Sequence, residues 1–450
     1  MITRIEIDGF KSFQDFSLNF RPFSAVVGPN ASGKSNLFDA LKFISLLAQT
    51  DVHSAMQSMR GEPEELFRVT PVREHTDMKF AVEVLLPKYG LDPFGARFEV
   101  NAQRLRYELA LTMRFDSEQM PIGIVVASES CRHIAKKDDR LSFINKSLIS
   151  YSSRRNPFME MSREGKVPII QIRQDGPTET GASKRGRPLK LAAGEATRTA
   201  LSTINTAEFP HLFALRETLS EIGFLEINPS EARKANDRFE EKKLRSDASN
   251  LASVLAHLKE ETGTPARPEG AVADISIDLS SLINSVKRVK VHSGSNVREY
   301  SFSIETEDGL DFSSRLISDG TLRLLALLTI LDDPSRRGIL CFEEPENGVH
   351  EGRIDDLIEI LRESTQDWSL EESPFQIIIN THSPAVLNSL HEKEIIAADL
   401  ISTVDPEAGC SVHRTRMRVG VDDDALDLEP GAILTRAEIS RLLRKRQGQA

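Results

Sequence analysis

The first 27 residues alternate between apolar and polar positions with the period of β-strands. This alternation marks residues 2–7 and 16–20, and a further strand-like run, Ser24-Ala25-Val26-Val27, follows. A glycine-rich turn then leads to a segment in which the apolar residues from Leu37 to Ala48 lie on one helix face. The pattern therefore predicts strands, a tight turn and an amphipathic helix.

The pattern of apolar and polar residues in the rest of the chain predicts further strands and helices. Strands are expected over 78–126 and 286–304, and helices over 208–262. Residues 150–200 are poor in large apolar side chains and rich in Gly and Pro, so mainly loop is expected there. From 316 to 398, apolar helices alternate with short apolar strands, which is typical of a parallel sheet covered on both faces.

Composition narrows the class of protein. The chain has 450 residues, 39% hydrophobic and 28% charged, with a formal net charge of −11. This balance excludes a generally basic nucleic-acid coat but leaves room for a local basic groove. The three cysteines form no C-x-x-C pair, and no apolar run reaches about 18 residues. We expect a cytoplasmic protein without a disulfide framework or a membrane span.

Residues 28–35 read GPNASGKS and match the P-loop pattern G-x-x-x-x-G-K-[ST]. The motif follows a predicted strand and precedes a predicted helix, so its backbone N–H groups can surround phosphates. Lys34 supplies a cation to the β- and γ-phosphates, and the Ser35 hydroxyl can ligate Mg²⁺. A chance glycine-rich turn is the alternative, but the strand–loop–helix context favours binding of ATP with Mg²⁺.

Two further motifs end apolar strands. Residues 339–345 read ILCFEEP, which delivers Glu343 and Glu344 to the carboxyl edge of the predicted sheet, where ligands bind. One acid can hold the Mg²⁺ shell, and the other can polarise an attacking water. His382 ends the next strand and can donate a hydrogen bond to a γ-phosphate. A histidine that only supports the structure is the alternative for His382.

The fourth motif is LISDGT at residues 316–321, directly before an apolar helix. Ser318 is expected to cap this helix, and Gly320 permits close backbone approach at the helix start. Taken alone, the motif favours simple helix capping over anion binding.

The order of these four motifs resembles that of ABC-type ATPases, specifically SMC/RecF/Rad-type heads and OLD-like bacterial ATPases. The matching segments are IEIDGFKSF (5–13), GPNASGKSNL (28–37), LISDGTLRLL (316–325), FEEPENGVH (342–350) and IINTHSP (378–384). The resemblance implies an α/β fold, an ABC-type P-loop ATPase head with a mixed sheet core, an antiparallel β lobe and a helical insertion. No heptad pattern persists, so coiled-coil arms are not expected.

The resemblance also implies roles for individual residues. Glu344 would be the catalytic base and His382 the switch histidine, while Glu343 and Ser35 would hold Mg²⁺. Residues 347–350 would form a loop that crosses a dimer seam. Lys34 would contribute to both binding and catalysis, and the ATP-binding set would be Gly28, Asn30, Ser32, Gly33, Lys34, Ser35, Asn36 and, from a second subunit, Ser318 and Gly320. Because the chain holds one copy of each motif, the resemblance implies a homodimer or higher oligomer that sandwiches ATP.

Some positions depart from the family pattern. Glu343 replaces the usual Asp, and Asp319 replaces the middle glycine of the transporter-type signature; both changes fit the RecF/OLD-like branch. Only 68 residues follow His382, too few for the Toprim nuclease domain of OLD-like enzymes. An effector such as a nuclease or toxin would therefore be a separate chain. Gln103 lies in a suitable region for the glutamine of a Q-loop, but no further signal supports it.

These motifs predict four regions: the first head part at 1–145, a basic loop and helical insertion at 146–275, the second head part at 276–400 and a tail at 401–450. The expected function is that of the sensor ATPase of a bacterial anti-phage system, which controls a separate effector. A RecF-like DNA-repair ATPase and a nucleotide-gated scaffold with incidental turnover stay open.

A basic segment bears on the DNA alternative. Residues 154–190 hold nine Lys/Arg against four Asp/Glu, and KRGRPLK at 184–190 resembles the core of an AT-hook, which enters the minor groove. A flexible basic loop is the preferred interpretation. The acidic run around Asp422 is interpreted as a solvated loop rather than a metal cluster.

Overall fold

The structure, a computed structural model, describes residues 1–70, 75–162, 167–175, 188–293, 298–366, 374–404 and 411–420, together with 433–434, 437–438 and 441. The chain forms two compact units. The first comprises Met1–Ile222, Trp368–Gln376 and Glu392–Ala450, and the second comprises Gly223–Asp367 and Ile377–His391. In the described part of the chain, no helix has the length and apolar character that crossing a membrane requires.

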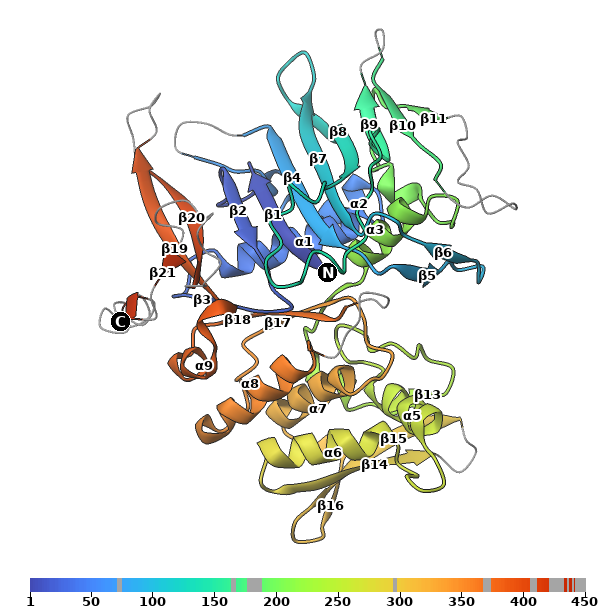
Figure 1. Cartoon of the computed structure of the whole chain (residues 1–450). Coiled ribbons are helices and arrows are strands. Elements are labelled where there is room, and N and C mark those ends of the chain that lie inside the picture. The colour runs from blue at the N-terminus through green and yellow to red at the C-terminus, as the bar shows by residue number, and fades with distance from the viewer. Residues whose placement is uncertain are drawn as a thin grey trace. The chain divides into compact units, whose positions relative to one another are not determined.

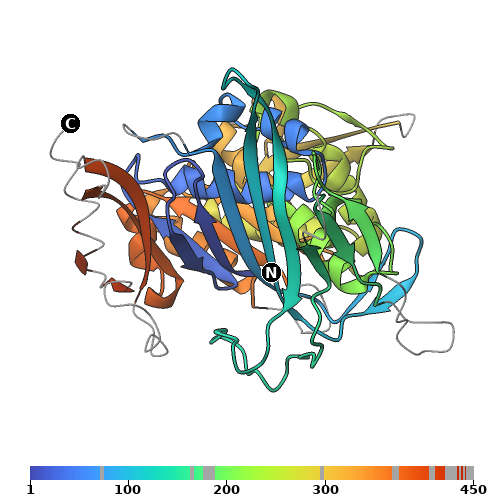
Figure 2. The ribbon, with the colours of Figure 1, turned by 90° about the horizontal axis from the view of Figure 1, so that it is seen from above.

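A large antiparallel sheet dominates the first unit. Its strand order is β11-β10-β9-β8-β7-β4-β1-β2, and the long strands curve across the unit in Figure 2. The strands are β1 (Ile2–Asp8), β2 (Phe16–Asn19), β4 (Asp77–Leu85), β7 (Arg104–Phe115), β8 (Pro121–His133), β9 (Met159–Ser162), β10 (Ile169–Ile172) and β11 (Leu189–Ala192). The alternating side chains Thr3, Ile5 and Ile7 of β1 are buried, as the period of two requires.

The first unit also holds the strand that leads into the P-loop. β3 (Phe23–Val27) pairs in parallel with β19 (Ile395–Val404), and β19 pairs antiparallel with β20 (Ser411–Gly420). Helix α1 (Lys34–Leu47) follows the P-loop, and its buried face includes Phe43, whose ring stacks on Phe10 at 5.8 Å. The remaining elements are α2 (Val52–Gln57), β5 (Tyr89–Leu91), β6 (Arg97–Glu99), α3 (Pro210–Ser220) and β21 (Ile433–Leu434).

The second unit contains three neighbouring strands of a sheet and, separately, a small antiparallel sheet. β17 (Ile339–Glu343) lies between β12 (Ile222–Phe224) and β18 (Gln376–Thr381). Helices α5 (Leu251–Thr262) and α6 (Ala271–Leu282) pack on the antiparallel pair β14 (Val286–Ser293) and β15 (Glu299–Thr306), as Figure 1 shows. The other elements are α4 (Pro229–Ala232), β13 (Asn236–Asp237), β16 (Asp311–Ser313), α7 (Asp319–Leu331), α8 (Ile354–Glu363) and α9 (Pro384–Ser389).

The fold class expected from the sequence is confirmed, since a mixed sheet with a parallel strand pair accompanies an antiparallel sheet. The expectation of mainly loop over 150–200 is wrong for β9, β10 and β11. These four-residue strands are stabilised by pairing with each other and with β8, which a local pattern does not reveal. Of the helices expected over 208–262, α3 and α5 are the long ones, and between them lie the short strands β12 and β13 and the short helix α4.

The expected domain boundaries stay predictions. Residues 184–187 of the AT-hook-like segment and the acidic run around Asp422 lie outside the described residues.

Candidate functional site

The P-loop belongs to the first unit and joins β3 to α1. Gly33 is the N-cap of α1 and has φ = +95°, a conformation that glycine adopts without the steric cost of a Cβ atom. A Cβ atom at Gly33 would lie 2.0 Å from Thr415 Oγ1, which belongs to β20. The Thr415 hydroxyl also lies 2.6 Å from Ser12 Oγ, and this oxygen accepts a hydrogen bond from Asn36 Nδ2 at 2.7 Å. The glycine is therefore required by both backbone conformation and packing.

The polar side chains of the P-loop are suited to an anionic ligand. Lys34 Nζ donates to the carbonyl oxygens of Gly28 at 2.7 Å and Pro29 at 3.0 Å, so the cation lies within the loop. Ser32 Oγ is buried and has no hydrogen-bond partner in the described part of the chain. A buried hydroxyl without a partner is costly, and a phosphate oxygen at the N-terminus of α1 would satisfy it. Asn30 and Ser35, also expected in the ATP site, are exposed.

The other three motifs lie in the second unit, where the ends of β17 and β18 face each other. Glu343 Oε1 accepts a hydrogen bond from Asn380 Nδ2 at 3.1 Å, and the Glu344 backbone N–H donates to the Asn380 carbonyl at 2.9 Å. The guanidinium of Arg323, from α7, donates to the Glu343 carbonyl. These contacts bring together the two acids that the sequence placed at a strand end.

Glu344 is held in an unusual conformation. Its φ is +49°, in the left-handed region, which costs a residue with a Cβ atom roughly 1–2 kcal/mol. Its carboxylate Oε1 lies 2.9 Å from His382 Nδ1, and Oε2 accepts a hydrogen bond from Asn347 Nδ2 at 2.8 Å. The expected proximity of an acid to His382 is therefore observed. Backbone strain held by several bonds is typical of functional positions.

Burial affects the charged groups around these acids. The Arg323 guanidinium lies 4.8 Å over the Phe342 ring, and burial lowers its pKa, while the charges of Glu344, Glu346 and Glu343 oppose that effect. Burial raises the pKa of Glu346, whose Oε1 accepts a hydrogen bond from Thr381 Oγ1 at 2.5 Å. One arginine thus faces a cluster of three carboxyl groups.

Ser318 caps α7, as the sequence predicts. Its hydroxyl accepts a hydrogen bond from the Thr321 backbone N–H at 3.2 Å. Two residues later, Gly320 lies directly against Gly348, because a Cβ atom at Gly320 would fall 2.8 Å from the Gly348 Cα atom. The start of α7 therefore packs on the loop that the sequence assigned to a dimer seam. A role of Ser318 in another subunit's site stays a prediction.

Several residues at these sites were not singled out by the motifs. Thr381, Glu346 and Arg323 lie inside or beside the quoted segments, but only their contacts distinguish them from ordinary polar neighbours. Gln103, considered for a Q-loop, is fully buried; its Nε2 donates to the Leu86 carbonyl at 3.1 Å and its Oε1 accepts from the Ser150 N–H at 3.0 Å. Its side chain is therefore committed to the core.

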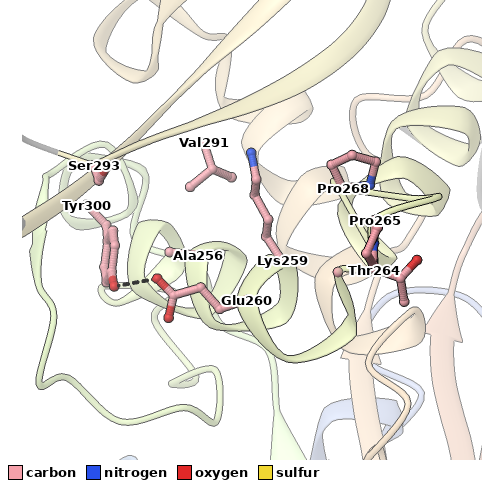
Figure 3. A pocket seen from close by; sticks show the side chains of 10 residues that line it. Ala256, Lys259, Glu260, Thr264, Pro265, Pro268, Val291, Ser293 and Tyr300 are labelled. Carbon is pink, nitrogen blue, oxygen red and sulfur yellow. Dashed lines mark hydrogen bonds between the residues drawn. The ribbon is translucent and has the colours of Figure 1, made fainter.

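No group of three or more His, Cys, Asp or Glu side chains within the described residues is arranged to hold a metal ion. A separate pocket of about 430 Å³ in the second unit contains none of the motif residues. Figure 3 shows that Tyr300 closes one side of it and donates a hydrogen bond to Glu260 at 2.8 Å. The pocket therefore does not contribute to the motif cluster.

Comparison with known families agrees with this geometry. A family described as "AAA domain, putative AbiEii toxin, Type IV TA system" matches residues 137–388, more than half of the chain. The chain belongs to this AAA domain family. The "RecF/RecN/SMC N terminal domain" family matches residues 1–69, which include the P-loop. This AAA domain protein is accordingly an SMC/RecF-like ABC ATPase head, as the motif order indicated.

Individual relatives share only the fold or a short segment with this AAA domain protein. A solved structure of an SMC head bound to the C-winged helix domain of ScpA has a TM-score of 0.50 and 13% identity, and it covers 95% of this chain and 99% of that one. This likeness shows the fold. The chromosome partition protein Smc of Methanocaldococcus jannaschii is 50% identical over 44 residues, and structural maintenance of chromosomes protein 1 of Arabidopsis thaliana is 47% identical over 45 residues. Each match spans 10% of this chain and 4% of the relative's length.

Proposed function

We propose that this AAA domain protein binds ATP with the P-loop and hydrolyses it with Glu344 as the base. The Lys34 cation, the unpaired Ser32 hydroxyl and the N-terminus of α1 supply the groups that bind a polyphosphate. The observation that carries the hydrolytic part of the proposal is the contact of Glu344 Oε1 with His382 Nδ1 at 2.9 Å, at the end of a strand.

Glu344 and His382 have different roles in the hydrolysis of the γ-phosphate. Glu344 orients a water and accepts its proton, and His382 donates a hydrogen bond that depends on the phosphate being present. Ser35 and Glu343 would hold Mg²⁺, which neutralises phosphate charge when bound. A hydroxyl and a carboxylate are oxygen donors of the kind that Mg²⁺ takes, and in ATPase sites this ion fills the rest of its shell with water and phosphate oxygens.

We further propose that ATP binding joins two heads, with Ser318 and Gly320 of one head facing the nucleotide of the other. The exposed position of Ser318 at the N-terminus of α7 supports this arrangement, because its cap hydrogen bond leaves the hydroxyl accessible. The similar SMC head is bound to the C-winged helix domain of ScpA. We infer that this head likewise acts with a separate protein.

The test uses Glu344→Gln, which keeps the shape of the side chain and removes the base. Hydrolysis should fall by about 10²-fold or more while ATP binding persists, so ATP should stabilise a dimer that light scattering detects. Glu363→Gln is the matched control, since Glu363 is an exposed acid at the end of α8. If Glu344→Gln turns over ATP like wild type, or if Glu343→Gln alone abolishes turnover, the roles of the two acids are wrongly assigned.

For the biological role, we propose the ATPase subunit of an anti-phage system that controls a separate nuclease or toxin. The support is the description of its family, which names a toxin of a type IV toxin–antitoxin system. Cells that carry the gene with its neighbours should survive phage challenge, and Lys34→Ala should remove that protection. Strong ATP-dependent, salt-sensitive DNA binding without any protection would favour a RecF-like repair ATPase instead. ATP-dependent assembly with negligible turnover would favour a scaffold.

A further inference from the structure

The residue beside His382 has a contact that the proposed chemistry does not use. Thr381 is fully buried, and its hydroxyl donates to Glu346 Oε1 at 2.5 Å. The same hydroxyl oxygen accepts a hydrogen bond from the Ser383 backbone N–H at 2.9 Å. One hydroxyl therefore ties the turn after β17 to the backbone on both sides of His382.

His382 itself has little packing to hold it. Its side chain is 47% exposed, and its Nδ1 lies 2.9 Å from Glu344 Oε1. A half-exposed imidazole keeps several rotamers available unless the backbone beneath it is fixed. The place where the ring meets Glu344 consequently depends on residues 381 and 383.

The Glu346 carboxyl is costly for the fold. Its Oε2 is buried and has no hydrogen-bond partner in the described part of the chain. A buried polar atom without a partner destabilises the folded state, and a buried apolar side chain would avoid that cost. The bond between the Glu346 carboxyl and the Thr381 hydroxyl is therefore a contact that packing alone does not require.

We propose that Glu346 is a positioning residue that acts through the Thr381 hydroxyl to fix His382 against Glu344. The inference deepens the proposed function, since it assigns the residue that keeps the switch histidine in place for hydrolysis. The alternative is a clamp that only holds the turn after β17 against the end of β18.

The test compares Thr381→Val, which keeps the shape and removes the hydroxyl, with Thr381→Ser, which keeps the hydroxyl. Thr381→Val leaves the His382 ring less well positioned for hydrolysis, so kcat should fall about tenfold or more, with the KM for ATP unchanged. Thr381→Ser should restore most of kcat. Thr329→Val is the matched control, because Thr329 is buried in α7 and its hydroxyl bonds only the Leu325 carbonyl.

Two further measurements separate positioning from a structural clamp. In a His382→Ala background, Thr381→Val should cause no additional loss of kcat, because the hydroxyl acts through the missing ring. The ¹⁵N resonances of the His382 ring, assigned with His382→Ala, should change in Thr381→Val and stay as in wild type in Thr381→Ser. If Thr381→Val does not fold, Glu346→Ala and Glu346→Gln replace the pair, since Gln keeps the acceptor oxygen for Thr381.

The ¹⁵N spectrum of the His382 ring can be measured without ATP hydrolysis. The proposed ATPase function and the positioning role of Glu346 can therefore be refuted independently. Absent hydrolysis in wild type overturns the proposed function, and an unchanged His382 spectrum in Thr381→Val overturns the positioning role. Equal losses of kcat with and without His382, or equal losses in Thr381→Val and Thr381→Ser, also overturn it.

Discussion

Asp332 offers a quantitative test of the electrostatics around α7, the helix that begins at the Ser318 cap. Asp332 is the C-cap of α7, and its Oδ2 is buried without a hydrogen-bond partner in the described part of the chain. Burial, together with the charges of Asp278 and Asp274, raises the Asp332 pKa from 3.8 to about 7, against the opposing charge of Arg336. A carboxylate at the C-terminal end of a helix is also unfavourable because the helix dipole is negative there.

The sign of the effect on stability follows from this shift. The folded state holds the Asp332 proton more tightly than the unfolded state, so stability is full below about pH 4 and falls as pH rises toward 7. At 1.36 kcal/mol per pKa unit, the shift of about three units corresponds to roughly 4 kcal/mol as an upper limit. Solvent access at the helix end reduces this, and we expect about 2 kcal/mol.

Asp332→Asn removes the ionisation and nearly keeps the shape. Urea unfolding should therefore show the variant to be more stable than wild type by about 2 kcal/mol at pH 8, and by a smaller margin of about 1.4 kcal/mol at pH 5. The control is Asp138→Asn, at an exposed turn in the first unit, which should change stability equally at both pH values. A stability difference for Asp332→Asn that is the same at pH 5 and pH 8 would refute the reasoning.

Three further substitutions test the site. Lys34→Ala should abolish binding of a fluorescent ATP analogue with little change in melting temperature; retained binding would remove Lys34 from the site. Gly33→Ala would place a Cβ atom 2.0 Å from Thr415 Oγ1 at φ = +95°, so thermal melting should show a loss of at least about 1 kcal/mol, and an unchanged melting temperature would contradict the packing. Gly348→Ala would place a Cβ atom 2.6 Å from Gly320 Cα, and steady-state kinetics should show a lower kcat with ATP binding intact. Wild-type turnover in Gly348→Ala would mean that this contact does not matter for hydrolysis.

Local sequence patterns were sufficient to predict those elements whose structure depends on the periodicity of apolar and polar residues. The alternation over residues 2–7 corresponds to β1, and the run at 24–27 corresponds to the buried strand before the P-loop. Ser318 caps α7 because its hydroxyl accepts a hydrogen bond from the backbone N–H of Thr321, three residues later. The spacing in the sequence is sufficient to predict this bond. The proximity of Glu344 and His382 followed from both residues ending apolar strands.

Contacts between distant segments could not be read from the sequence. Thr415 packs against Gly33 across more than 380 residues, and it belongs to β20, which pairs with β19. In the sequence, Glu346 has the features of an ordinary turn residue, and only the folded structure brings its carboxyl to the Thr381 hydroxyl. The raised pKa of Asp332 likewise depends on two acids from α6.

The central claim, that two heads share each ATP site, is tested by mixing two inactive variants. Lys34→Ala damages the P-loop half of a site, and Ser318→Arg damages the half that a second head supplies. A mixed dimer then has one site with both defects and one intact site, so subunit exchange should restore ATPase activity. Random pairing makes about half of the dimers mixed, so recovery should approach about a quarter of wild type if the sites act independently. A Ser318→Arg protein that hydrolyses ATP normally by itself would contradict the claim, because Ser318 would then be only the cap of α7.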